Sequence, residues 1–376
     1  MNHPDSSGFE IQASSRTLAR NEKEEDATLW RPATRYVIPI FQRAYSWGQI
    51  EASQLVNDLL DSFTGRHGGI PSDPMFIGTM QIEDRDKYRE DDFEFHHKVI
   101  DGQQRITTLI LLLRALELAG VNAGGSLPTD YTRRLITHVG GGIQQSYLEA
   151  ALSWDGVSPF PPDDLNRYQQ NLVMIRNLIA PSLEEDAAID LTGFADYLLS
   201  KVYFVVIETR AGLSKTLQIF KSINTTGLDL DGGDVFKIRF YEYLRFFDKD
   251  KSSERDRETF IEVAKLYDEI EKRNKKAGWR IAEMEHILSI ARHYVATEAD
   301  LAHASRLAAG TTFFEHFFDV VINKQTRNGF AREKCESFTL SLDLIRELID
   351  VRFKWDEQEA APSEKEVNAS ARRQRS

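Results

Sequence analysis

The sequence predicts an α+β protein, built as a small mixed β-sheet core with a large α-helical subdomain. In the first part of the chain, short apolar runs rich in β-branched and aromatic residues, typical of strands, alternate with runs of helical spacing. From about residue 213 to residue 353 the apolar spacing is helical throughout. The 376 residues are 41% hydrophobic and 28% charged, which is ordinary for a globular protein of two compact units, or of one large domain with subdomains.

The sheet core is expected to combine strands from distant parts of the sequence. The expected strands are residues 35–41, 76–84, 93–101 and 201–209. The second and third of these strands are joined by a charged loop, which indicates a strand pair. The last is apolar and β-branched, and we expect it to return to the same sheet.

Helices are expected where apolar residues recur every three or four positions. They are residues 49–63, the segment from Asp101 to a stop at Gly120, and residues 165–179, 280–296 and 336–353. In segment 280–296 one apolar stripe is formed by Ile281, Met284, Ile287, Leu288 and Ala291.

These patterns divide the chain into five parts. Residues 1–29 and 356–376 are polar and charged, and we expect flexible tails there. The sheet core is expected at residues 30–120 plus 200–245, a helical insertion at 121–199, and a C-terminal helical subdomain at 246–355.

The charge balance excludes a general nucleic-acid coat protein. The chain has 47 basic and 59 acidic residues and a formal net charge of -12. A local basic patch can still contact a DNA backbone. Such a patch is offered by Lys272, Arg273, Lys275, Lys276 and Arg280.

A cytoplasmic location is expected from the cysteine content and the N-terminal residues. The lone Cys335 excludes an internal disulfide framework and a multi-cysteine zinc site, and we expect it to be a small apolar filler. The polar N-terminus lacks the features of a secretory signal. The longest apolar run, 109–113, is far shorter than the ~20 residues that a membrane span needs.

Polar side chains gather where the third expected strand turns into a helix. Gly102 can take the positive φ that such a turn needs, and the helix then begins with unpaired backbone N–H groups and a positive dipole end. Such a terminus favours a phosphate. Arg105 offers a planar fork that matches phosphate oxygens, and Thr107 and Thr108 offer hydroxyl donors. Asp101 could hold a ribose hydroxyl or a Mg²⁺ ion.

A purely structural interpretation of this turn is also open. Asp101 would then be a helix N-cap, worth ~1 kcal/mol, and Arg105 a structural salt bridge. The helix itself is apolar on nearly every side, which is typical of a core helix and would give a site a rigid mount.

Two further polar clusters favour a binding site. Gln42 and Arg43 directly follow the first strand, and Asn224 and Asp229 lie in segment 219–241. Structural roles remain open for their neighbours as well. Tyr45 and Trp47 can be core residues, and Asp229 or Asp234 can cap the next helix.

Taken together, these segments resemble a known family. The stretches IPIFQRAYSW, FIGTMQIED…KVIDGQQRITTL and FKSINTTGLDLDGGDVFK closely resemble the N-terminal NTPase and DNA-sensing domain of GmrSD-type restriction systems. That domain is also found in SspE-like effectors that act on phosphorothioate-modified DNA. The resemblance spans roughly residues 30–245 and implies a ParB/sulfiredoxin-like sheet core.

The resemblance implies nucleotide binding and hydrolysis, with GTP favoured and Mg²⁺ as cofactor, coupled to the sensing of modified or foreign DNA. The implied catalytic residues are Asp101, Gln103, Gln104 and Arg105, with Asp101 as the metal ligand. The implied nucleotide-binding residues are Gln42, Arg43, Gly102, Thr107, Thr108, Asn224 and Asp229. Gln103 or Gln104 would orient the attacking water, as a Gln does in some GTPases.

Two departures narrow what the resemblance implies. Sulfiredoxin chemistry needs a cysteine in the phosphate-binding turn, where this chain has Gln103 and Gln104, so redox repair is excluded. No His-Asn-His arrangement follows near the C-terminus. We therefore expect the nuclease on another chain or in a missing C-terminal region, with no membrane partner, and leave a homo-oligomer open.

Two other functions remain open from the sequence. The chain could be a ParB-like DNA-binding or nicking module, whose turn holds a DNA backbone phosphate. It could also be a non-catalytic regulatory subunit that binds nucleotide or DNA only as a ligand.

Overall fold

The computed structural model describes residues 10–19, 27–31, 33–83, 93, 95–121, 127–128, 130–158, 165–180, 189–210, 254–277, 281–298 and 342–360. The chain divides into two compact units, Met1–Leu228 and Asp229–Ser376, which are described separately. Cys335, Asn224, Asp229 and Asp234 lie outside the described residues.

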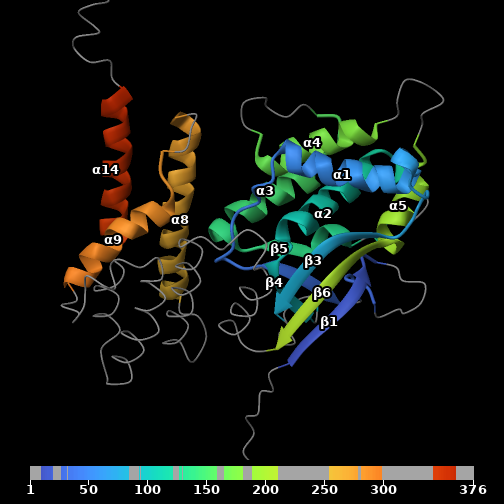
Figure 1. Cartoon of the computed structure of the whole chain (residues 1–376), viewed down its shortest axis with the longest axis horizontal. Coiled ribbons are helices and arrows are strands. Elements are labelled where there is room, and N and C mark those ends of the chain that lie inside the picture. Colours follow the sequence, from blue (N-terminus) through green and yellow to red (C-terminus); the bar gives the residue numbers. More distant parts are fainter. Residues whose placement is uncertain are drawn as a thin grey trace, which may run out of the picture. The chain divides into compact units, whose positions relative to one another are not determined.

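The first unit contains a mixed sheet, which confirms the predicted α+β class (Figure 1). Its strands are β1 (Glu10–Thr17), β2 (Thr34–Ile38), β3 (Met75–Glu83), β4 (Phe95–Asp101), β5 (Leu135–Thr137) and β6 (Val202–Arg210). The described residues form the strand order β1-β6-β3-β4-β2-β5. The pairs β1–β6 and β3–β4 are antiparallel, whereas β6–β3, β4–β2 and β2–β5 are parallel. The four strands expected from the sequence are thus all present and all in one sheet.

Helices of the first unit gather over one face of this sheet (Figure 1). They are α1 (Gln49–Thr64), α2 (Gln103–Leu118), α3 (Ile143–Leu152), α4 (Arg167–Ile179) and α5 (Leu191–Ser200). Short 3-10 helices occupy Arg66–Gly68, Tyr131–Arg133 and Val139–Gly142. Alternate residues of β6, namely Val202, Phe204 and Val206, are buried beneath this helical layer.

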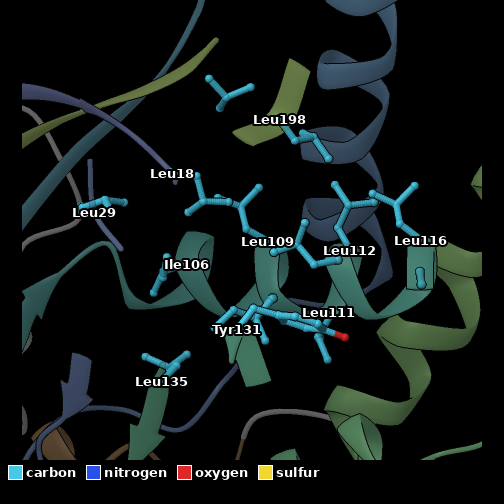
Figure 2. Close-up of a cluster of buried hydrophobic side chains, with 14 of the residues drawn as sticks. Leu18, Leu29, Ile106, Leu109, Leu111, Leu112, Leu116, Tyr131, Leu135 and Leu198 are labelled. Carbon is cyan, nitrogen blue, oxygen red and sulfur yellow. The ribbon is translucent and has the colours of Figure 1, made fainter. Parts of the chain in front are cut away.

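Helix α2 forms the centre of the hydrophobic core, as its all-round apolar sequence predicts. Its buried leucines lie on every side of the helix: Leu109, Leu111, Leu112, Leu113 and Leu116. Figure 2 shows Leu109 and Leu112 toward Leu18 and Leu198, with Leu111 toward Tyr131. Since full burial of one such side chain contributes about 1.5–3 kcal/mol, the helix is held firmly in place. Its N-terminus is therefore a rigid mount for the residues that precede it.

Two strands lie where the sequence predicted none. Strand β1 falls in the segment expected to be a flexible tail, so that expectation is wrong for residues 10–17. Its polar sequence gives no alternating pattern, and it is an edge strand that pairs with β6 from Glu10 to Thr17. Strand β5 lies in the expected helical insertion and is only three residues long. The other proposed domain boundaries stay predictions, because residues 211–253 lie outside the described part.

The second unit is helical where it is described. It contains α8 (Glu254–Ala277), α9 (Met284–Glu298) and α14 (Leu342–Ala360), with α14 packed against both α8 and α9. All five residues of the stripe expected in segment 280–296 are buried. Helix α14 continues to Ala360, a few residues into the expected C-terminal tail. None of the helices in the described ranges combines the length and hydropathy that a membrane span needs.

Candidate functional site

The turn between β4 and α2 places a helix N-terminus at the C-terminal end of β4, a strand in the interior of the sheet. Gly102 is the N-cap residue with φ +89°, and a Cβ there would lie 3.2 Å from the side chain of Met80. Asp101 is instead the last residue of β4, and no side chain of the described residues caps the helix. The interpretation of Asp101 as an N-cap is therefore wrong. The first-turn N–H groups of α2 stay available to an anion.

Arg105 reaches from the first turn of α2 to the backbone of β3. Its Nη1 donates to the carbonyl oxygen of Ile77 at 3.1 Å, and its Nη2 lies 3.5 Å from Oδ2 of Asp101. The two side chains remain 23% and 31% exposed. An ion pair this exposed contributes about 1 kcal/mol or less. The structural salt bridge thus exists, yet it is weak enough for Arg105 to engage a phosphate as well.

Gly78 makes the position of Arg105 possible, and the sequence interpretation missed it. Its φ is +116°, and a Cβ on this residue would lie 1.8 Å from Nη1 of Arg105. The register of β3 against β6 shifts between Phe76 and Thr79, as in a β-bulge. A glycine inside a strand pattern is the signal that could have indicated this close approach.

The loop after β2 brings Gln42 to the same turn. Nε2 of Gln42 donates to the carbonyl oxygen of Ile100 at 2.9 Å, just before Asp101. Nε2 of Gln103 donates to Oε1 of Gln42 at 3.2 Å. Two residues that are far apart in sequence, and that both belong to the predicted site, are therefore in direct contact.

Gln104 holds this loop against α2. Its Oε1 accepts from the backbone N–H groups of Ser46 at 2.9 Å and Trp47 at 3.2 Å, while its Nε2 donates to the carbonyl oxygen of Ala44 at 3.2 Å. Both ends of the Gln104 amide are therefore bonded to the loop backbone.

The remaining predicted residues differ in exposure. Arg43 is exposed on the loop. Thr107 and Thr108 are buried in the interior, and Tyr45 is buried with them, so in this structure their hydroxyls are not open to a ligand. The third motif, with Asn224 and Asp229, lies outside the described residues.

Asp101 fits a Mg²⁺ ion only as a single carboxylate ligand. Among the described residues, no three His, Cys, Asp or Glu side chains gather closely enough to hold a metal. Mg²⁺ is commonly bound by one or two carboxylates together with substrate phosphates and water. The partly exposed carboxylate of Asp101 suits that arrangement.

The basic patch proposed on the second unit is partly neutralised. Arg273 donates to Glu269 at 2.7 Å and lies 2.6 Å from Asp350. The hydrogen bond with Glu269 is the main reason why the pKa of Arg273 is raised. Lys272 and Lys276 are exposed, whereas Arg280 and the side chain of Lys275 lie outside the described part.

Comparison with known families identifies the first unit. Residues 21–241, more than half of the chain, match the family described as GmrSD restriction endonuclease, N-terminal domain. The chain belongs to this family. A comparison with curated proteins finds no match. The GmrSD family associates the chain with a DNA restriction system, and the matched residues contain the whole of the β4–α2 turn and the Gln42 loop.

Proposed function

We propose that this GmrSD N-terminal domain hydrolyses a nucleoside triphosphate, with GTP favoured, and that hydrolysis licenses DNA cleavage by a nuclease domain elsewhere in the restriction system. The observation that supports this function is the α2 N-terminus, which no described side chain caps and which is flanked by Arg105 and the Gln42–Gln103 pair. Such a terminus attracts phosphate through its N–H groups and its dipole.

Binding would use the cations beside this terminus. Arg105 engages phosphate oxygens with its fork, and exposed Arg43 supplies a second cation from the loop. Asp101 would hold Mg²⁺, which when bound neutralises phosphate charge. Modified or foreign DNA is the signal to which we expect turnover to respond.

The hydrogen bonds distinguish the two candidate glutamines. Gln104 is bonded to the loop at both ends of its amide, so its role is to position the loop. Gln103 uses only Nε2, toward Gln42, and its Oε1 has no hydrogen bond within the described residues. A free amide oxygen can accept a hydrogen bond from water and orient it for attack. We therefore assign water orientation to Gln103.

The test is phosphate release from the purified protein with each NTP and Mg²⁺, with and without modified DNA. We expect Arg105→Ala to lower kcat/KM by about 100-fold, in line with the loss of a charged phosphate contact. The control is Arg66→Ala, since Arg66 forms a similarly long pair with Asp61, at 3.6 Å, at the end of α1. Unchanged turnover in Arg105→Ala would contradict the assignment.

The same assay separates the two alternative functions. In a ParB-like nicking module the turn would hold a DNA backbone phosphate. The wild-type protein would then nick a supercoiled plasmid without turning over NTP, and Asp101→Ala would lose the nicking. The engagement of Arg273 with Glu269 and Asp350 counts against extended DNA contact by the second unit. Saturable nucleotide binding without turnover would indicate a regulatory subunit.

A further inference from the structure

A buried chain of hydrogen bonds connects helix α4 to the loop that carries Gln42 and Arg43. Nδ2 of Asn171 donates to the hydroxyl oxygen of Tyr45 and to the carbonyl oxygen of Trp47, each at 2.9 Å. The hydroxyl of Tyr45 lies 2.8 Å from that of Thr108, which in turn donates to the carbonyl oxygen of Gln104 at 2.9 Å. Asn171 is thus bonded to the loop twice.

The direction of this chain is fixed. Thr108 donates its single hydroxyl proton to the Gln104 carbonyl, so in the Tyr45–Thr108 bond Tyr45 is the donor, while its oxygen accepts from Asn171. Burial raises the pKa of Tyr45 to about 12, so the hydroxyl keeps its proton at neutral pH. The ring of Tyr45 also packs on Tyr168 of α4, with centroids 4.8 Å apart. Helix α4 therefore holds the loop through a ring contact and two hydrogen bonds.

Asn171 is a polar residue in an otherwise apolar setting. Asn171 is fully buried on a face of α4 whose other members, Leu172, Ile175 and Ile179, belong to the hydrophobic core. Its Oδ1 is buried without a hydrogen-bond partner among the described residues. Leaving a buried polar atom unsatisfied is costly, and the two hydrogen bonds that Nδ2 makes to the loop are what offset this cost.

We propose that Asn171 is a positioning residue that sets the Gln42–Arg43 loop for the substrate of the adjoining turn. This inference rests on the proposed NTP hydrolysis. Asn171 lies outside all three motifs, 126 residues from Tyr45 in sequence, so helix α4 takes part in the site without contributing a motif residue. A change in the position of α4 would be transmitted to the loop through Asn171.

The first test measures loop order without using activity. Hydrogen–deuterium exchange of peptides spanning residues 42–48 is compared in the full chain and in its Asn171→Ala variant. We expect exchange there to rise by about tenfold or more, because the substitution removes both of the buried hydrogen bonds from Asn171 to the loop. Peptides from β6 should exchange as before, because the change is local. The control is Asn177→Ala, which makes the same substitution at an exposed position of α4.

A second variant guards against a general loss of folding. Tyr45→Phe removes only the hydroxyl that Asn171 and Thr108 share, and it keeps the ring contact with Tyr168. Its control is Tyr147→Phe, at an exposed tyrosine of α3. Faster exchange of residues 42–48 in both Asn171→Ala and Tyr45→Phe, with unchanged exchange in the two control variants, supports the inference. If residues 42–48 exchange no faster in these two variants than in the controls, the inference is overturned.

Kinetics then distinguish positioning from packing. We expect Asn171→Ala to raise the KM for NTP by about fivefold or more with a smaller change in kcat, since the loop is assigned to binding. In an Arg43→Ala background the same substitution should have little further effect, because both act through one loop. Additive losses would overturn the positioning role. If the wild-type protein turns over no NTP, the proposed function fails, while the exchange result still decides whether Asn171 holds the loop.

Discussion

Gly78 occupies a position of β3 where any side chain would collide with the arginine of the candidate site. A Cβ would lie 1.8 Å from Nη1 of Arg105, and the φ of +116° disfavours other residues. We expect Gly78→Ala to lower the free energy of unfolding by about 2 kcal/mol and to reduce NTP turnover, because Arg105 must leave Ile77 and Asp101. Urea denaturation and phosphate release measure the two effects.

The matched control for this substitution is Gly142→Ala. Gly142 has a similar φ of +104°, but a Cβ there would meet no described atom within 4 Å. It therefore incurs the backbone strain without the collision. Equal losses in the two variants would show that the contact with Arg105 has no effect of its own.

The sequence predicted polar residues of the candidate site but not the residues that hold them in position. Asp101 and Arg105 were predicted because charged groups at a helix start suggest chemistry, and Gln103 was predicted from the family resemblance. Gly78 and Asn171 were not, since their roles depend on contacts between segments far apart in sequence. A glycine inside a strand pattern can indicate that some group approaches closely, but it does not reveal that the group is Arg105, and no pattern within α4 reveals that Asn171 supports a loop.

At the scale of elements, β1 is secured by a buried ion pair as well as by backbone pairing. Arg16 of β1 lies 2.8 Å from Glu208 of β6, with side chains 5% and 12% exposed. We expect Arg16→Met to lower the free energy of unfolding by about 3 kcal/mol, because it leaves a buried carboxylate short of its main partner. On the same strands, Arg210→Met removes an exposed pair with Glu10 and should cost under about 1 kcal/mol. If chemical denaturation gives the same loss of unfolding free energy for Arg16→Met and Arg210→Met, the buried ion pair does not secure β1 as argued.

The same ion pair makes stability depend on pH. Burial by itself raises the pKa of Glu208, but the hydrogen bond and charge of Arg16, helped by Arg31, outweigh burial and leave the pKa below its ordinary value. A lowered folded-state pKa contributes stability above the unfolded value, about 4.3, and that stability is lost as pH falls through the folded value. We expect the stability difference between wild type and Glu208→Gln to shrink below about pH 4.3. A difference that stays constant down to pH 3 would contradict the linkage.

Elements with a strong hydrophobic pattern were predicted within a few residues, whereas the sheet edges were not. The expected strand pair and the apolar strand before residue 210 are β3, β4 and β6. Strand β1 has no apolar alternation, since most of its side chains are exposed and its pairing depends on β6. Alternation of apolar residues indicates which side chains are buried, so it does not predict strands that are held mainly by backbone hydrogen bonds.

At the scale of the whole molecule, the hydrophobic core of the first unit lies within the matched family domain, except for Leu18, which precedes the match. The hydrophobic cluster around α2 draws all its buried members from Leu18 to Val206, and the family match runs from residue 21 to residue 241. A unit with its own core can fold alone. We expect a fragment of residues 1–241 to unfold cooperatively on heating, as followed by circular dichroism, and to keep the turnover of the full chain.

A shorter fragment shows why the end of this domain matters. Residues 1–200 retain every helix of the layer but lack β6, which lies between β1 and β3 in the sheet. Its removal takes Phe204 and Val206 from the core and leaves β1 without its partner strand. We therefore expect this fragment to show no cooperative transition. If both fragments melt alike, the sheet is not the folding unit. If the longer fragment also fails, folding of the GmrSD domain requires the remainder of the chain.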